Sequence, residues 1–170
     1  MDMEHQVHEF EPVFNRESRI LILGTFPSVK SRQNQFYYGH PQNRFWKVLA
    51  GICKCEVPQT LPEKKEMLLK NQIAVWDVIA SCDIAGSSDS SIKNVVPVDL
   101  SVILSQADIV HIYANGATAK KLYEKYQQDK TGIPIIGLPS TSPANASYSL
   151  ERLTDAWEQV MVNKLKKNKL

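Results

Sequence analysis

The chain has 170 residues, of which 43% are hydrophobic and 22% are charged, and its net charge at pH 7 is only +2. This length and composition fit one globular domain, while the small positive charge permits nucleic-acid binding without arguing for it. Without a long apolar run or a secretory signal, we expect no membrane association and a location in the cytoplasm or with the chromosome.

Three secondary-structure elements and a long loop are predicted in the first seventy residues. Residues 19–24 (RILILG) form a short β-branched run and predict a buried strand. Residues 25–40 are polar and aromatic, and a loop of this length in a compact domain usually carries function. A helix opened by proline is expected over 41–52, and a capping box with proline in its first turn predicts another over 60–71.

The next part of the chain continues the alternation of strands and helices. A second buried strand is predicted over 73–79, followed by a loop rich in Ser, Asp and Gly over 80–97. A short helix over 99–106 then leads into a third strand over 108–114.

The C-terminal third is predicted to contain a helix, a strand, a polar loop and a long helix. An Asn-Gly turn precedes the helix that ends near residue 128, and residues 134–138 (PIIGL) form the fourth strand. A polar loop over 139–148 ends at Ser149, which is expected to cap the final helix. We expect one domain over 1–170, with its core over about 19–160 and a basic helix end over 161–170.

This alternation predicts an α/β domain with a mainly parallel sheet that helices cover on both faces. In such sheets ligands bind beyond the carboxyl ends of the strands. The loops that follow the predicted strands therefore hold the candidate functional residues.

Three segments in or beside these loops have distinctive sequences, each with an ordinary structural explanation as well. Residues 24–28 (GTFPS) lack the glycines of a dinucleotide-binding turn and the Lys of a P-loop, which argues against a nucleotide cofactor. Residues 36–47 (FYYGHPQNRFWK) could stack an extruded base and bind phosphate, or could simply pack as an aromatic cluster. Residues 138–145 (LPSTSPAN) could approach a phosphate backbone, or could form an ordinary Ser/Pro turn.

Taken together and in this order, the three blocks resemble the uracil-DNA glycosylase superfamily. The GTFPS and LPSTSPAN blocks are most similar to its hypoxanthine-DNA (deoxyinosine) glycosylase branch, whereas Asn43 to Lys47 is also similar to the mismatch-specific branch. The resemblance implies a three-layer α/β/α sandwich with a four-stranded, mainly parallel sheet. It also implies a monofunctional DNA glycosylase that flips out a deaminated base, preferably hypoxanthine, and hydrolyses its N-glycosidic bond with water. The implied partner is single- or double-stranded DNA with a damaged base, bound by a monomer without cofactor or metal.

Two positions depart from the uracil-cutting branches of this family. Where those branches carry a polar residue in the first turn and at the start of the last loop, this chain has Phe26 and Leu138. Efficient uracil excision is therefore not expected, and other residues must supply the catalytic groups. Asn43 and Asn115 are the candidate catalytic residues, because an amide can both orient water and hold a base.

The remaining candidates are assigned to the base and to the DNA backbone. Phe26 and Tyr38 are expected to stack on the base, and Asp77 to accept its ring N–H, unless Asp77 is a buried carboxylate bonded to backbone or arginine. Arg44 could instead form a structural ion pair. The candidate DNA-binding residues are Lys30, Arg32, Arg44, Ser140, Thr141, Ser142 and Asn145.

Several alternatives remain open at this stage. The chain could be a mismatch-type uracil/thymine glycosylase, a catalytically inactive DNA-damage-binding domain, or a small-molecule α/β hydrolase. The last is weakened because no Gly-x-Ser-x-Gly motif occurs and His40 is the only histidine in the candidate loops. The three cysteines are odd in number and lack the spacing of a disulfide framework, so they are expected to be reduced. Cys53 and Cys55 with His5 and His8 do not have the usual spacing of a zinc site.

Overall fold

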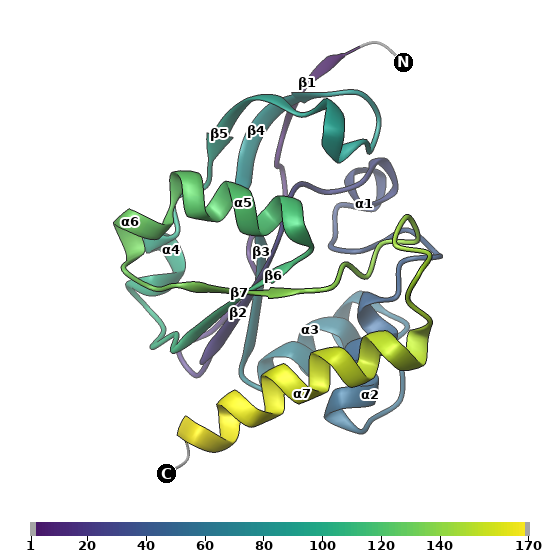
Figure 1. The fold of residues 1–170 in the computed structure, drawn as a ribbon, viewed down its shortest axis with the longest axis vertical. Coiled ribbons are helices and arrows are strands. Elements are labelled where there is room, and N and C mark those ends of the chain that lie inside the picture. The colour runs from purple at the N-terminus through teal and green to yellow at the C-terminus, as the bar shows by residue number, and fades with distance from the viewer. Residues whose placement is uncertain (1–2, 169–170) are drawn as a thin grey trace.

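The computed structural model describes residues 3–168, with side chains as far as Met161, so the predicted basic end over 161–170 lies almost entirely outside the described side chains. The central sheet has four parallel strands in the order β3-β2-β6-β7. These are β2 (Ile20–Gly24), β3 (Ile73–Asp77), β6 (His111–Asn115) and β7 (Ile135–Leu138). Their carboxyl ends share one edge of the sheet (Figure 1), which confirms the predicted parallel arrangement.

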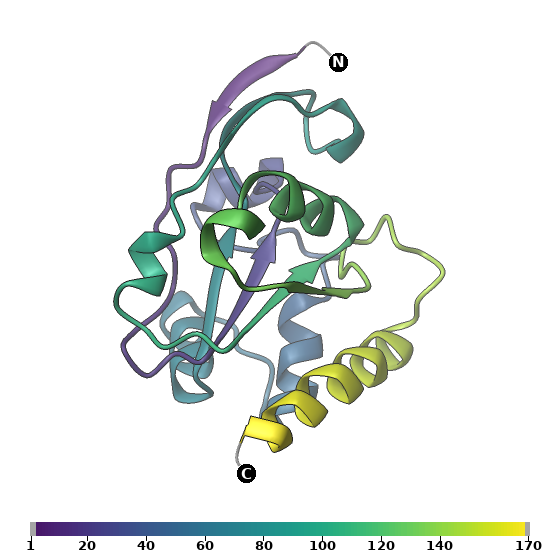
Figure 2. The same ribbon diagram turned by 60° about the vertical axis from the view of Figure 1, so that its left-hand side comes forward.

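Helices cover both faces of this sheet, as expected for a three-layer sandwich. One layer contains α2 (Phe45–Cys53), α3 (Leu61–Lys70) and α7 (Leu150–Asn168), and the other contains α4 (Ser101–Leu104), α5 (Ala117–Tyr126) and α6 (Gln128–Thr131). Figures 1 and 2 show the two layers on opposite sides of the strands. None of the helices between residues 3 and 168 is long and apolar enough to cross a membrane.

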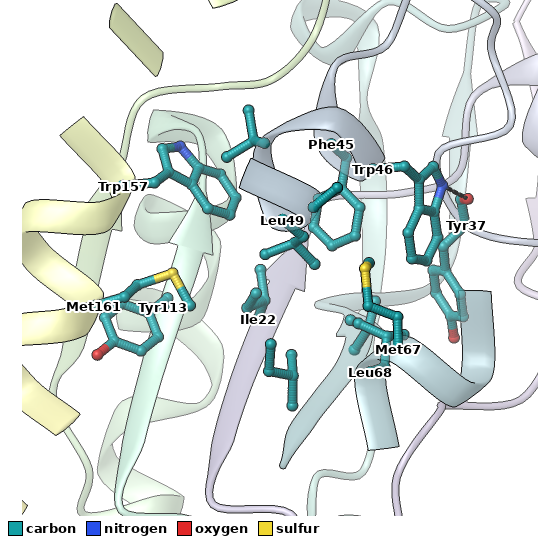
Figure 3. Packing of buried hydrophobic residues seen from close by; sticks show 14 of the residues in the cluster. Ile22, Tyr37, Phe45, Trp46, Leu49, Met67, Leu68, Tyr113, Trp157 and Met161 are labelled. Carbon is teal, nitrogen blue, oxygen red and sulfur yellow. Dashed lines mark hydrogen bonds between the residues drawn. The ribbon is translucent and has the colours of Figure 1, made fainter. Parts of the chain in front are cut away.

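The alternation of side chains along the strands explains why both faces are apolar. Ile20 and Ile22 of β2 join the cluster beneath α2, α3 and α7, whereas Leu21 and Leu23 join the cluster beneath α4 and α5. Figure 3 shows the first cluster, in which Trp157 of α7 packs against Phe45 of α2. A strand buried on both faces must be apolar at every position, and β2 is.

The predicted helix starts are largely confirmed. The Thr60 hydroxyl accepts the Glu63 N–H at 3.2 Å, which is the N-cap bond of a capping box, and the Glu63 carboxylate accepts from the Thr60 hydroxyl at 2.9 Å. The Ser149 hydroxyl accepts the Arg152 N–H at 3.1 Å and so caps α7. The helix predicted from Pro41 begins at Phe45, because residues 40–43 form a turn in which the Asn43 N–H donates to the His40 carbonyl at 3.0 Å.

Two segments predicted as loops contain regular structure. Residues 80–97 lie largely in β4 (Ile79–Ile84), the 3-10 helix η1 (Asp89–Ser91) and β5 (Lys93–Pro97), while α1 (Val29–Asn34) lies inside the predicted loop 25–40. The strand β1 (Glu4–Val7) pairs with β4 to complete an antiparallel sheet in the order β1-β4-β5. The two edge strands of this sheet, β1 and β5, are short and mostly exposed. Their sequences therefore lack the apolar runs by which the strands of the parallel sheet were predicted.

Candidate active site

A cavity of about 530 Å³ opens at the carboxyl edge of the parallel sheet. Its walls come from the turn after β2, the end of β3, the segment before α2, the end of β6 and the loop after β7. Eight of the predicted site residues line it: Phe26, Tyr38, Asn43, Asp77, Asn115, Ser140, Thr141 and Ser142. Residues up to 116 positions apart in the chain therefore meet at the edge where a ligand site was expected.

Three side chains in the cavity wall form a continuous hydrogen-bond network. The Thr141 hydroxyl donates to Asn43 Oδ1 at 2.8 Å and accepts from Asn115 Nδ2 at 3.0 Å. The Thr141 N–H also donates to Asn115 Oδ1 at 3.0 Å. Both polar ends of the Asn115 amide are thus bonded to Thr141, so Asn115 is placed to hold the loop after β7.

Asn43 keeps one polar group available for a ligand. Its Oδ1 accepts from the Phe45 N–H at 3.0 Å as well as from Thr141, which occupies both lone pairs of the oxygen. Among the described residues, no acceptor is bonded to its NH2 group. The amide is therefore better suited to donating to a bound base than to orienting water through its oxygen.

Thr141 and Arg44 do not have the DNA-contacting positions that the sequence predicted. Thr141 is 0% exposed, and its hydroxyl is already bonded to two amides, so it cannot reach a phosphate. The Arg44 guanidinium donates to the backbone carbonyls of Thr141, Ser142, Asn145 and Tyr148. No ion pair of Arg44 is formed within residues 3–168, and its role is to shape the loop from within.

The remaining polar residues of this loop are partly available to solvent. The hydroxyls of Ser140 and Ser142 each accept a backbone N–H at 3.1 Å, so the proton of each hydroxyl remains free to donate. The Asn145 NH2 donates to the Ser140 carbonyl at 3.0 Å. Asn145 is therefore committed to the loop, whereas the two serines can still contact a partner.

Tyr38 lies with one ring face against the core. Its ring stacks on Phe45 with 3.9 Å between centroids, so only the opposite face could stack on a base. Its backbone is left-handed, with φ of 53°, a conformation that non-glycine residues adopt rarely. Burial raises the pKa of its hydroxyl, and the nearby Asp77 carboxylate adds to the rise.

Gly24 allows the first turn to approach these groups closely. A Cβ atom at this position would lie 2.4 Å from Asp77 Oδ1 and 2.8 Å from the Tyr38 hydroxyl oxygen. Any other residue would displace one of the two side chains from the cavity. Gly24 is the residue paired with Asp77 in the register of β2 and β3, and the short distance between them leaves no room for a Cβ atom.

Asp77 is buried against a histidine that the sequence analysis did not single out. Asp77 Oδ2 lies 2.7 Å from His8 Nε2, and the two side chains are only 5% and 3% exposed. The predicted alternative, a carboxylate bonded to backbone or arginine, is therefore replaced by a His–Asp pair. His8 directly follows β1 (EHQV). The weak alternating pattern of β1 was the only sequence signal for a strand that would place His8 beside Asp77.

Phe26 lines the cavity, whereas Arg32 and Lys30 lie on α1 and are not part of the cavity lining. Phe26 is buried in the cavity wall, and the Arg32 guanidinium lies 5.6 Å from its ring centroid. Arg32 also donates to the Gly86 carbonyl at 2.9 Å, so it supports this wall and has little freedom to meet a phosphate. Lys30 is exposed on α1 and is the better placed of the two for a DNA contact.

The cysteines lie apart from this cavity. Burial raises the pKa of the Cys53 thiol to about 11, and the neighbouring Cys55 adds to the rise, so Cys53 is not a reactive thiolate. His5 and His8 pair with Asp83 and Asp77 rather than with the cysteines. Within the described part of the chain, no group of three or more His, Cys, Asp or Glu side chains is placed to hold a metal ion.

Comparison with known proteins gives consistent matches over most of the chain. The family model "Uracil DNA glycosylase superfamily" matches residues 11–166. A Methanosarcina acetivorans protein named "Hypoxanthine DNA glycosylase" is 34% identical over 153 residues, which cover 89% of this chain and 95% of that protein. A protein of the same name from Methanosarcina barkeri is 36% identical over 86 residues, or 50% of this chain and 54% of the relative.

A solved structure also matches the fold closely. The solution NMR structure of a proposed uracil DNA glycosylase from Methanosarcina acetivorans has a TM-score of 0.76 and 33% sequence identity. The match covers 89% of this chain and 93% of that structure. The family model covers most of the chain and the fold matches as well, so the chain belongs to the uracil DNA glycosylase superfamily.

Proposed function

We propose that the protein is a monofunctional DNA glycosylase that removes hypoxanthine from DNA. The observation that carries this proposal is the cavity, which combines an amide donor, a carboxylate acceptor and an aromatic ring at the carboxyl edge of the sheet. Its volume of about 530 Å³ is sufficient for a purine base. The similarity to a nearly full-length relative named hypoxanthine DNA glycosylase supports the choice of base.

In this proposal the extruded base is held by three kinds of contact. The free face of Tyr38 stacks on the base, and Phe26 closes the cavity beside it. The Asn43 NH2 donates to an acceptor atom of the purine and so stabilises the negative charge that develops as the base leaves. Asp77 accepts the N–H of the deaminated purine ring.

The absence of polar groups at two positions supports the preference for hypoxanthine over uracil. Phe26 lines the cavity with an apolar ring, and Leu138 is buried in the core at the end of β7. Neither residue can position water in the way implied for the uracil-cutting branches. Excision therefore depends on holding the departing base while water captures the sugar cation that remains.

The DNA backbone is proposed to lie across the loop after β7 and the N-terminal end of α1. The Ser140 and Ser142 hydroxyls can donate to phosphate oxygens, and Lys30 can neutralise a further phosphate. These contacts carry no sequence information, which suits an enzyme that must find damage in any sequence. We propose that the protein acts on DNA as a monomer, and that a double-stranded substrate is accepted once the base is extruded.

The test is excision from matched duplexes that contain deoxyinosine or deoxyuridine, followed by alkaline cleavage of the abasic product. We expect cleavage at deoxyinosine and little at deoxyuridine or at a thymine mismatch. Faster cleavage at uracil would instead identify a mismatch-type enzyme. A duplex that is shifted in a gel but never cut would identify a DNA-damage-binding domain, and no binding at all would favour a small-molecule hydrolase.

A further inference from the structure

We propose that His8 is a positioning residue that makes Asp77 a selective acceptor for the ring N–H of a deaminated base. The inference rests on the proposed function and names the group that determines its specificity. His8 does not contact the base; it acts by fixing the orientation of the carboxylate, so that the second carboxylate oxygen is presented to the base. The class of ligand recognised is a purine with a protonated ring nitrogen next to a carbonyl group.

The two oxygens of Asp77 have different surroundings. His8 Nε2 lies 2.7 Å from Oδ2 and is the only side-chain partner of this carboxylate within residues 3–168. Oδ1 lies on the Gly24 side, where a Cβ would come within 2.4 Å of it, and Asp77 lines the cavity there. One oxygen is therefore bonded to the protein, while the other is available to a ligand.

The position of His8 is itself fixed by the fold. Its backbone N–H donates to the Ala80 carbonyl at 2.7 Å, which continues the pairing of β1 with β4. Its ring lies 4.5 Å from Phe10, 5.8 Å from Tyr37 and 6.1 Å from Phe26, measured between ring centroids. Its Nδ1 is buried and has no hydrogen-bond partner within residues 3–168, so the bond to Asp77 is the polar interaction that the ring makes there.

The chemistry of deamination matches a carboxylate held in this way. Adenine has a lone pair on N1, whereas hypoxanthine has an N1–H donor beside its O6 carbonyl. An ionised carboxylate can only accept, so it pairs with hypoxanthine and repels the lone pair of adenine. The hydrogen bond from His8 holds Oδ2 in place and offsets part of the carboxylate charge beside the departing base.

The test compares two substrates, because a general defect would slow both alike. Single-turnover excision is measured on duplexes with deoxyinosine and on duplexes with deoxynebularine, whose purine base has a lone pair at N1. For His8→Leu we expect deoxyinosine excision to fall by roughly 10- to 100-fold, the usual effect of losing a buried hydrogen bond to a charged group. Excision of the purine base should change little, so the ratio of the two rates should fall about tenfold or more.

Two further variants separate positioning from folding. His8→Gln can place an amide N–H at the position of Nε2 and is expected to restore most of the ratio. His5→Leu is the matched control, because His5 and Asp83 form a similar pair at 3.0 Å but are exposed by 63% and 30% on the edge sheet. Circular dichroism and thermal melts of each variant show whether it is folded.

A double-variant comparison completes the design. If His8 acts through Asp77, adding His8→Leu to Asp77→Asn should cause less than a twofold further loss. Equal losses on both substrates with His8→Leu, failure of His8→Gln to rescue, or fully multiplicative losses in the double variant would each overturn the inference. If His8→Leu does not fold, His8→Gln and Asp77→Asn still decide it through their substrate ratios. A wild-type protein that cuts neither substrate would instead overturn the proposed function.

Discussion

At the level of single residues, the NH2 group of Asn43 is the one whose loss should slow excision most. Removing a pre-organised donor from a closed site typically costs about 100- to 1000-fold in rate, and we expect this of Asn43→Ala on deoxyinosine. Asn43→Asp keeps the oxygen that accepts from Phe45 and Thr141 but lacks the NH2. It should be as slow as the alanine variant in single-turnover assays while melting closer to the wild type. An aspartate variant within a few-fold of wild-type activity would assign the function to the oxygen.

Tyr38 tests whether the base stacks on an aromatic face. Stacking contributes about 1–3 kcal/mol per base, so Tyr38→Ala should weaken binding and excision much more than Tyr38→Phe. The buried Tyr38 hydroxyl meets no group at hydrogen-bond geometry within residues 3–168, although Asn115 is near enough to lower its pKa in part. Tyr38→Phe should therefore cost little stability, as measured by urea denaturation. Equal damage from both substitutions would show that the hydroxyl, rather than the ring, is needed.

At the level of elements, the loop after β7 depends on a single guanidinium from the segment before α2. Arg44 donates to four backbone carbonyls of this loop, which a lysine ammonium with three protons and no fork geometry cannot match. We expect Arg44→Lys to lower the free energy of unfolding by about 1–3 kcal/mol. Amide hydrogen exchange should speed up over residues 140–148.

Arg19→Lys is the control for this substitution. The Arg19 guanidinium also donates to backbone carbonyls, at 3.0 and 3.2 Å, but it lies at the amino edge of the sheet. Its replacement should leave exchange in residues 140–148 unchanged. If Arg44→Lys altered only the salt dependence of DNA binding and not the exchange, Arg44 would be a phosphate contact after all.

At the level of the whole molecule, α7 joins the core to the candidate active site. Trp157 is 0% exposed, packs against Phe45, and donates from its indole N–H to the Pro139 carbonyl at 2.8 Å (Figure 3 shows its position in the core). Trp157→Ala should lower the free energy of unfolding by about 3–5 kcal/mol through the cavity it leaves. Trp157→Phe should be milder in chemical denaturation because it keeps most of the packing. A loss below about 1 kcal/mol for the alanine variant would contradict the packing seen here.

The number of phosphate contacts across the DNA-binding surface predicts how DNA binding responds to salt. Each phosphate neutralised releases roughly one counterion, so binding should weaken as salt rises, and Lys30→Ala should reduce the slope of log K against log salt by about 1. Lys70, at the end of α3, is exposed but lies at the opposite edge of the sheet, and Lys70→Ala should leave the slope unchanged. Fluorescence anisotropy with a deoxyinosine duplex measures both. An unchanged slope for Lys30→Ala would show that α1 does not touch the backbone.

Local pattern was sufficient to predict the main framework from sequence. The strands of the parallel sheet were recognised as short, mainly apolar runs, as in β2. The starts of α3 and α7 were recognised from N-cap hydroxyls that accept a backbone N–H three residues later, a contact that depends only on local sequence. Strand order then placed the polar residues at one edge. Asn115 and Asp77 were identified at predicted strand ends and Asn43 in a block that resembles the family, and all three line the cavity.

How those residues are used depends on contacts that the fold creates, because their partners are distant in the chain. His8 lies 69 residues from Asp77, and the Arg44 side chain bonds to carbonyls 97 to 104 residues away. Thr141 was predicted to contact DNA, but its hydroxyl is buried and hydrogen-bonded to the side-chain amides of Asn43 and Asn115. The β1-β4-β5 sheet was missed because short, half-exposed strands are stabilised by pairing with each other rather than by an apolar pattern of their own.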